Sequence, residues 1–338
     1  MNGPTEPLVS VVVIGRNEGD RLIRCLDSVR AMDPPPGPVE LVYVDSNSTD
    51  QSVARARERG ARVVEMPAGR QTAARARNAG WRSTAAPLVL FLDGDTILDH
   101  RFLAAAIAGL ADPQVAVVWG HRRELKPGDT IYNRVLDLDW IYPPGPAEFC
   151  GGDALMRRSA LEQVGGFDEG LIAGEEPELC RRLRERGHVI SHLDHPMTLH
   201  DLAIHSFGQY WRRAFRAGHA YAEVAARYRD SALPLWQGEV RQNYRHGVFL
   251  LGLPVAALAA GAVLRSWVPP LFALGLLCLL VLRTARRCRW KSPDFALCLA
   301  YACHSHLQKI PILLGQLQYW RNRRQGRHHT LIEYKRAP

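Results

Sequence analysis

The chain has 338 residues, of which 47% are hydrophobic, so it is long enough to bury a sizeable core and to form two domains. Its formal net charge of +9 favours an anionic partner such as a membrane surface, nucleotide phosphates or nucleic acid. However, no nucleic-acid-binding motif and no zinc-type Cys/His spacing is present, and the seven cysteines form no paired framework, which favours reduced thiols in a cytosolic setting.

The N-terminal part alternates apolar runs with helical patterns. Residues 1–7 are polar and too few for a signal peptide, so we expect the first domain to stay in the cytoplasm. Strands are predicted over 8–14, 40–44, 62–65 and 87–92, and the helices between them end near residues 32, 59 and 84. This alternation predicts a doubly wound sheet, in which the loops after the strands place Asn17, Asp45 and Asp93 at one crevice.

The strongest local signal is Asp93-Gly94-Asp95, which directly follows the apolar run 88–92. Side chains at positions i and i+2 of a strand face the same way, and a glycine between them lets a ligand approach closely. Two carboxylates at the carboxyl edge of a sheet suit a divalent cation that carries phosphates. A turn with two solvated aspartates is the alternative.

Beyond residue 98 the pattern is less regular. We predict helices over 99–111, 154–164, 176–186 and 206–229, a strand over 115–119, a strand pair around 189–200, and an irregular insertion over 120–150. Three glutamates, Glu175, Glu176 and Glu178, stand at the start of one helix, which is more negative charge than the helix dipole needs.

Two uncharged stretches mark the C-terminal part. Residues 247–264 and 267–282 are near the length of a membrane span, and the basic residues that flank the pair predict a helical hairpin with both ends in the cytoplasm. A buried hairpin of a soluble protein and a shallow re-entrant hairpin are the alternatives. Polar residues interrupt the apolar stretch 295–320, which predicts an interfacial helix, and the basic tail 321–336 suits anionic head groups.

Several motifs together resemble those of a known family. They are Asn17-Glu18, Val44-Asp45, Arg77-Asn78-Ala79-Gly80, Asp93-Gly94-Asp95, Cys150-Gly151-Gly152-Asp153, Gly165-Gly166-Phe167-Asp168 and Glu175-Glu176. In their order and spacing, over roughly residues 8–230, the chain resembles the family-2 glycosyltransferases, which are inverting enzymes. The resemblance implies an α/β fold of the GT-A nucleotide-diphospho-sugar transferase type, with a doubly wound, mostly parallel sheet, here followed by the C-terminal helical hairpin.

The resemblance also implies roles for matching residues. Asp45 would read the nucleotide base, Asp93 and Asp95 would position Mg²⁺ or Mn²⁺ with the donor diphosphate, and His200 would complete that site. The implied donor-binding set is Asn17, Glu18, Asp45, Arg77 and Asp93, and the implied acceptor-binding set is Gly151, Gly152, Asp153, Gln209 and Arg212. For His200 a structural role is the alternative, with His195 and His205 as nearby competitors.

The catalytic base would be Glu176, with Glu175 as its competitor, because an inverting transfer needs a carboxylate that takes the proton of the acceptor hydroxyl. The family usually has Asp at this position. The family also commonly has Asp-Gly or Asp-Asn where this chain has Ser46-Asn47. The segment Gln209–Arg213 resembles a Q-x-x-R-W motif but ends in Arg213, so processive synthesis is not implied.

The sequence therefore predicts three parts: a transferase domain over 1–232, a transmembrane or re-entrant hairpin over 233–292, and an interfacial helix with a basic tail over 293–338. The predicted protein is an inverting, metal-dependent glycosyltransferase at the cytoplasmic face of the inner membrane. It would use a nucleotide-sugar donor and a lipid-linked or polysaccharide acceptor, and no nucleic acid. A sugar nucleotidyltransferase and a degenerate, transferase-like membrane scaffold are the alternatives.

Overall fold

The fold comes from a computed structural model, which describes residues 6–326, so part of the predicted basic tail lies outside the described residues. The chain divides into two compact units. The first runs to Leu125 and resumes over Trp140–Leu202, and the second contains Lys126–Asp139 and the chain from Ala203 onward. This boundary precedes the one expected at residue 232, because the helix that follows Ser206 packs with the C-terminal helices. The three-part functional division stays a prediction.

A mixed sheet forms the centre of the first unit. Its strand order is β3 (Arg62–Glu65), β2 (Val39–Asp45), β1 (Val9–Gly15), β4 (Leu88–Asp93), β8 (Ala154–Arg157), β6 (Val115–Glu124), β9 (Val189–His200) and β5 (Thr96–Leu98), and β7 (Gly145–Ala147) pairs with β9. Strand β1 runs parallel to both β2 and β4, with Gly15 opposite Asp45 and Ile14 opposite Asp93. The predicted parallel core therefore exists, and its register brings Asp45 and Asp93 to one edge.

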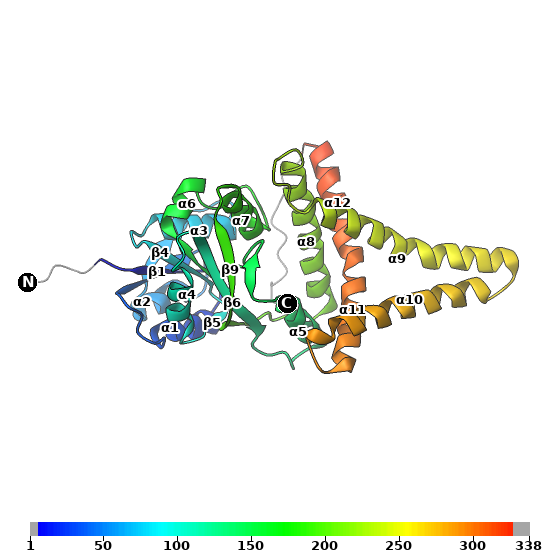
Figure 1. The fold of residues 1–338 in the computed structure, drawn as a ribbon, viewed down its shortest axis with the longest axis horizontal. Helices are drawn as coiled ribbons and strands as arrows, with labels where there is room; N and C mark the ends of the chain where they lie inside the picture. Colours follow the sequence, from blue (N-terminus) through cyan, green and yellow to red (C-terminus); the bar gives the residue numbers. More distant parts are fainter. Residues whose placement is uncertain (1–5, 327–338) are drawn as a thin grey trace, which may run out of the picture. The chain divides into compact units, whose positions relative to one another are not determined.

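Helices cover both faces of this sheet (Figure 1). They are α1 (Asp20–Arg30), α2 (Ser52–Glu58), α3 (Ala73–Arg82), α4 (Phe102–Gly109), α6 (Arg158–Val164) and α7 (Glu175–Glu185). Right-handed crossovers place α1 and α2 on the face opposite α3, as Figure 1 shows. Helix α3 lies directly on β1, since a Cβ at Gly80 would be 2.2 Å from Val12 Cγ1.

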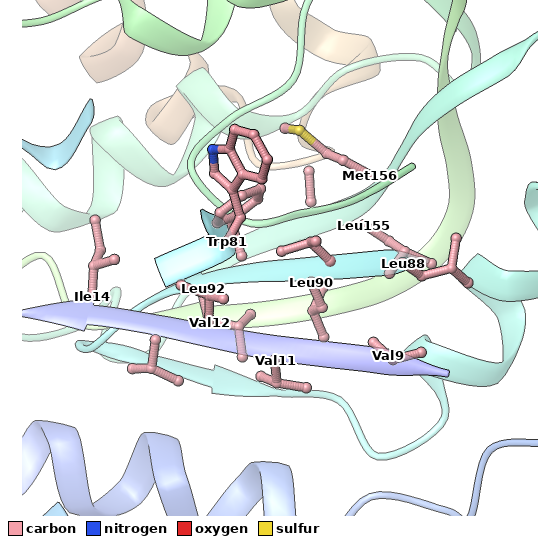
Figure 2. Packing of buried hydrophobic residues seen from close by; sticks show 14 of the residues in the cluster. Val9, Val11, Val12, Ile14, Trp81, Leu88, Leu90, Leu92, Leu155 and Met156 are labelled. Atoms are coloured by element: carbon pink, nitrogen blue, oxygen red, sulfur yellow. The ribbon is translucent and has the colours of Figure 1, made fainter. Parts of the chain in front are cut away.

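The core is the layer of apolar side chains on either side of β1 and β4. Val11, Val12 and Leu90 have no exposed surface. Figure 2 shows Trp81 and Met156 on one side of these strands and Val11 on the other. Strands buried on both faces explain why the sequence reads as continuous apolar runs rather than as an alternating pattern.

Three local predictions were wrong. Residues 154–164 are a strand, β8, followed by α6, because Ala154–Met156 are fully enclosed between β4 and β6 and pairing overrides their helical preference. The expected strand pair at 189–200 is the single strand β9. The irregular stretch 120–150 contains the end of β6, then α5 (Ile131–Asp137), a short 3₁₀ helix (Leu138–Trp140) and β7.

The second unit is helical. It contains α5, α8 (Phe207–Arg227), α9 (Gln237–Leu264), α10 (Val268–Arg287), α11 (Phe295–Leu307) and α12 (Lys309–Arg324). The expected single helix over 295–320 is thus two helices, α11 and α12. Helices α8 and α12 touch through glycines, since a Cβ at Gly218 would be 2.0 Å from the Ile312 carbonyl oxygen and one at Gly315 would be 2.1 Å from that of Phe215.

Helices α9 and α10 form the predicted hairpin (Figure 1). Among the described residues, these two helices are long and apolar enough to cross a membrane, a criterion that the core helix of a soluble protein also passes. A core helix is mostly buried, whereas only 11% of the apolar segment of each of these helices is buried. Val263 is 83% exposed and Phe272 73% exposed. The described chain therefore leaves the apolar faces of the hairpin uncovered.

Candidate active site

Two aspartates and a histidine meet at the carboxyl edge of the sheet. Asp93 ends β4, Asp95 lies in the following turn, directly before β5, and His200 ends β9. Pairing of β5 with β9 sets Thr96 opposite His200, so His200 Nε2 lies 3.3 Å from Asp95 Oδ1. One ligand atom from each of the three residues lies within 4.8 Å of the others. The sheet register thus brings together the three residues predicted to bind metal.

The chemistry of this cluster fits a divalent cation. Two carboxylates are ligands that Mg²⁺ and Mn²⁺ accept, and an imidazole is a common ligand of first-row transition metals. Asp95 and His200 are each only 5% exposed, so ionised groups here need a partner. Among the described residues the cluster does not include the competitor His195, whose Nδ1 lies 2.7 Å from the Pro196 carbonyl oxygen, and His205 belongs to the second unit.

Arg77 connects the aspartate edge to the start of α7. Its Nη2 lies 2.9 Å from Asp93 Oδ1, and its Nη1 lies 3.1 Å from Glu175 Oε1 and 2.8 Å from Glu176 Oε1. The side chain is 2% exposed. Burial by itself would lower the pKa of Arg77, but Glu176, Asp93 and Glu175 together raise it. Arg77 is therefore charged, and its guanidinium links Asp93 to the glutamates at the start of α7.

A second arginine, Arg122, was missed by the sequence analysis. Its Nη2 lies 3.3 Å from Asp93 Oδ2, and its guanidinium lies 5.1 Å from the ring centre of Trp140. Burial would raise the pKa of Asp93, but Arg77 and Arg122 lower it, so Asp93 is ionised. The only signal was the pair Arg122-Arg123, separated by two residues from the predicted strand 115–119, in a stretch interpreted as an irregular insertion.

Asp153 lies beneath the end of β4. It has no exposed surface, its Oδ1 accepts a hydrogen bond of 2.9 Å from the Asp93 amide, and its Oδ2 accepts one of 2.8 Å from the Thr198 hydroxyl. Burial raises the pKa of Asp153 to about 6, although Arg122 opposes this shift. These bonds, rather than a contact with an acceptor, occupy the carboxylate in the structure. The role predicted for Asp153 in acceptor binding stays untested.

The two neighbouring glycines differ in their surroundings. A Cβ at Gly152 would lie 2.5 Å from Arg77 Nη2 and 2.8 Å from Asp93 Oδ2. A Cβ at Gly151 would meet only Arg122 Nη1, at 3.7 Å. Gly152 therefore leaves the space that the Arg77–Asp93 ion pair fills.

Glu176 is the more accessible of the two paired glutamates. Its side chain is 15% exposed, against 8% for Glu175. Burial, and then the charge of Glu175, raise the pKa of Glu176 to about 7, although Arg77 opposes them. Glu178 is 1% exposed and bonds to Arg182 at 2.6 Å. The third glutamate therefore has a structural partner, and Glu176 has the properties of a proton acceptor.

The loops after β1 and β2 hold each other at the same edge. Asn17 Oδ1 accepts a hydrogen bond of 2.7 Å from the Thr49 amide, and Asp45 accepts one of 2.9 Å from the Tyr43 hydroxyl and one of 2.8 Å from the Ser48 amide. Asn47 has a φ of 61°, a conformation that favours Gly or Asn, which explains the residue found there. Glu18 pairs with Arg21 at 2.9 Å. The predicted donor loops are thus ordered by their own hydrogen bonds.

Two predicted acceptor residues belong to the second unit. Gln209 forms a capping box with Ser206 at the start of α8, where Gln209 Oε1 accepts a hydrogen bond of 3.1 Å from the Ser206 amide. Arg212 is exposed on the same helix. The structure thus gives Gln209 a role in capping the start of the helix, and the acceptor contacts of both residues stay predictions.

Comparison with family models returns two matches. The model described as glycosyl transferase family group 2 matches residues 88–307, which is more than half of the chain. The model described as glycosyl transferase family 2 matches residues 10–165. The two matches together contain all the motifs of the sheet edge and of α7.

Curated relatives and solved structures agree with the match to the family models. A pre-mycofactocin glycosyltransferase of Mycobacterium tuberculosis is 29% identical over 69% of this chain, and the match spans 51% of that protein. The glycosyltransferase AglE of Haloferax volcanii is 25% identical over 69% of this chain and 80% of its own length. The mannosyltransferase PcManGT of Pyrobaculum calidifontis, solved with GDP-Man and Mn²⁺, is 25% identical and superposes with a TM-score of 0.61 over 88% of this chain and 86% of that one. S. aureus TarS 1-349, at 17% identity and a TM-score of 0.51, supports the fold alone.

Proposed function

This chain belongs to the family-2 glycosyltransferases, and we propose that it transfers a sugar from a nucleotide-sugar donor to an acceptor at a membrane, with inversion at the anomeric carbon and with help from a divalent cation. The observation that carries this proposal is that Arg77 binds Asp93, a member of the cluster with Asp95 and His200, through Nη2 and binds Glu176 through Nη1.

Asp93, Asp95 and His200 would hold the cation. A bound divalent cation supplies positive charge that stabilises a nucleoside diphosphate as a leaving group. The Mn²⁺ in the related mannosyltransferase supports the same use here. On the donor side, Asp45 would accept a hydrogen bond from the base, since its loop and the Asn17 loop lie at the same sheet edge.

Glu176 would serve as the general base. As the acceptor oxygen bonds to the anomeric carbon and the bond to the diphosphate breaks, the Glu176 carboxylate takes the hydroxyl proton. A pKa of about 7 suits this task, because the carboxylate is basic enough to take a proton and is still partly ionised at neutral pH. Arg77 would act as a positioning residue, because its guanidinium already binds Asp93, Glu175 and Glu176.

The hairpin of α9 and α10 would lie in the inner membrane, with the transferase unit on the cytoplasmic side. Its exposed apolar faces support a lipid environment, and the basic residues at both of its ends support cytoplasmic termini. A catalytic unit held there would act on a lipid-linked glycan or a growing surface polysaccharide.

The test is donor hydrolysis by the purified full chain with UDP-, GDP- and dTDP-sugars in the presence of Mn²⁺. We expect His200→Ala to lose at least about tenfold in Mn²⁺ affinity and Glu176→Gln to lose about 10²–10⁴-fold in rate. His195→Ala is the matched control, since His195 lies on the same strand outside the cluster. Full activity in His200→Ala and Glu176→Gln would overturn the site, and failure of every donor to bind would favour a scaffold.

A further inference from the structure

A cavity of about 760 Å³ lies between α9 and α10, within the second unit. Helix α9 contributes Arg241, Gln242, Arg245 and Phe249, and helix α10 contributes Leu276 and Leu280. Its volume is within the range of pockets that bind small molecules. The residues that line it include no carboxylate.

The lining changes character along the helix axis. Arg241, Arg245 and Phe249 follow each other at four-residue intervals, so they share one face of α9. At a rise of 1.5 Å per residue, each step along this face is roughly 6 Å. The cavity therefore has a cationic end near the start of α9 and an apolar end formed by Phe249, Leu276 and Leu280.

Polar side chains fix the wall of this cavity. His246, which also lines it, has its Nε2 3.0 Å from His306 Nδ1, and His306 Nε2 lies 3.1 Å from the Thr284 hydroxyl. This chain of contacts joins α9, α11 and α10. The two helices that line the cavity are thus joined to each other through His306 of α11, and the cavity is an open groove on their surface.

The transition from charge to hydrocarbon matches one ligand chemistry. The last charged residue of α9 before the uncharged stretch 247–264 is Arg245, so the cationic end lies where that stretch begins. In a membrane-spanning hairpin, this is the level at which lipid phosphates give way to acyl chains. An apolar peptide would leave the arginines without counter-charges, and a free anion would leave the apolar end empty.

We propose that this cavity binds a resident phospholipid with an anionic headgroup, whose phosphate lies at Arg241 and Arg245 and whose acyl chains lie along Phe249, Leu276 and Leu280. The inference rests on the proposed position of the hairpin in the membrane. It adds a specific lipid site, separate from the sheet edge that holds the catalytic residues.

The test is lipid binding by the full chain in neutral detergent, measured by native mass spectrometry with phosphatidylglycerol and phosphatidylcholine. We expect the anionic lipid to be retained preferentially and the double variant Arg241→Gln/Arg245→Gln to bind it about thirtyfold more weakly. Arg286→Gln/Arg287→Gln is the matched control, because these two exposed arginines at the end of α10 do not line the cavity. The variant Arg241→Lys/Arg245→Lys should recover binding, since it restores the charge.

Equal retention of the two lipids, or an equal loss in the control pair, would overturn the proposal. Because the measurement needs no turnover, it does not depend on the proposed transferase activity, and the far-UV circular dichroism of the Gln variants reports that the chain is folded. Extraction of cell membranes with alkaline carbonate tests the position of the hairpin separately. A protein that stays in the membrane but does not prefer the anionic lipid would refute the lipid site alone.

Discussion

The pH dependence of the reaction is the most direct test of Glu176. The carboxyl has a pKa of about 7, against 4.5 for an ordinary glutamate, because burial and then the charge of Glu175 favour its protonated form. A general base works only when it is unprotonated. About a tenth of the Glu176 side chains are ionised at pH 6 and about a hundredth at pH 5. We therefore expect kcat/KM to fall about tenfold per pH unit below pH 7.

An ordinary glutamate in the same role would give a different profile. With a pKa of 4.5, it would be almost fully ionised at pH 6, and activity there would nearly equal that at pH 8. The assay is initial-rate transfer or donor hydrolysis between pH 5 and pH 8.5, with Mn²⁺ at saturation at each pH so that cation binding does not limit the rate. A flat profile across this range would refute the raised pKa of Glu176, and the base role itself would then rest on the loss of activity in Glu176→Gln.

Glu175 supplies an internal control for the cause of the shift. Its negative charge is the second-largest contribution to the raised pKa of Glu176. The variant Glu175→Gln removes that charge and should move the acidic limb of the profile to lower pH. In Glu176→Gln the limb should disappear together with most of the activity. If Glu175→Gln abolishes activity and Glu176→Gln keeps it, the two roles are exchanged.

Three further changes test the rest of the site. Gly152→Ala places a Cβ 2.5 Å from Arg77 Nη2 and should lower kcat/KM by about 10²-fold. Gly151→Ala is its control and should keep kcat/KM within about threefold of the natural chain. Equal losses in the two variants would contradict the packing argument. Asp153→Ala leaves the Asp93 amide and the Thr198 hydroxyl without their buried acceptor and should lower the stability by about 1–3 kcal/mol, seen as a lower Tm in detergent; an unchanged Tm would show that these bonds contribute little. Asp95→Asn should weaken Mn²⁺ binding about tenfold or more in calorimetry, and unaltered binding would exclude Asp95 as a ligand.

Sequence reasoning worked where local patterns decide the structure. The run Leu88–Leu92 is apolar at every position and became β4, a strand buried on both faces, so Asp93 had to emerge at a sheet edge. The parallel β1–β2 and β1–β4 pairs follow from alternating strands and helices, and they bring Asp45 to the same edge. The positions of Asp45 and Asp93 at this edge depend on short strand–helix–strand crossovers, which can be recognised from the sequence.

Long-range pairing explains what the sequence could not show. Arg122 reaches Asp93 because β6 continues to Glu124, and that extension depends on β9, a strand far along the chain. Asp153 is buried because β8 enters the sheet between β4 and β6, although Ala154–Met156 favour a helix. Arg77 was expected near the donor phosphates, and only the fold shows that three carboxylates already surround it.

The balance of charge at the sheet edge supports a cation more strongly than the aspartate pair does alone. Two guanidinium groups, those of Arg77 and Arg122, face carboxylates from three segments of the chain, namely Asp93, Asp95, Asp153, Glu175 and Glu176. Carboxylates outnumber the arginines, and buried uncompensated charge is costly. In the structure, part of this excess shows as raised pKa values at Asp153 and Glu176, so protons relieve the repulsion there. A divalent cation at Asp93, Asp95 and His200 would supply positive charge at the aspartate edge and leave the Glu176 carboxylate free to accept a proton, so this balance of charge supports the proposed use of a metal ion.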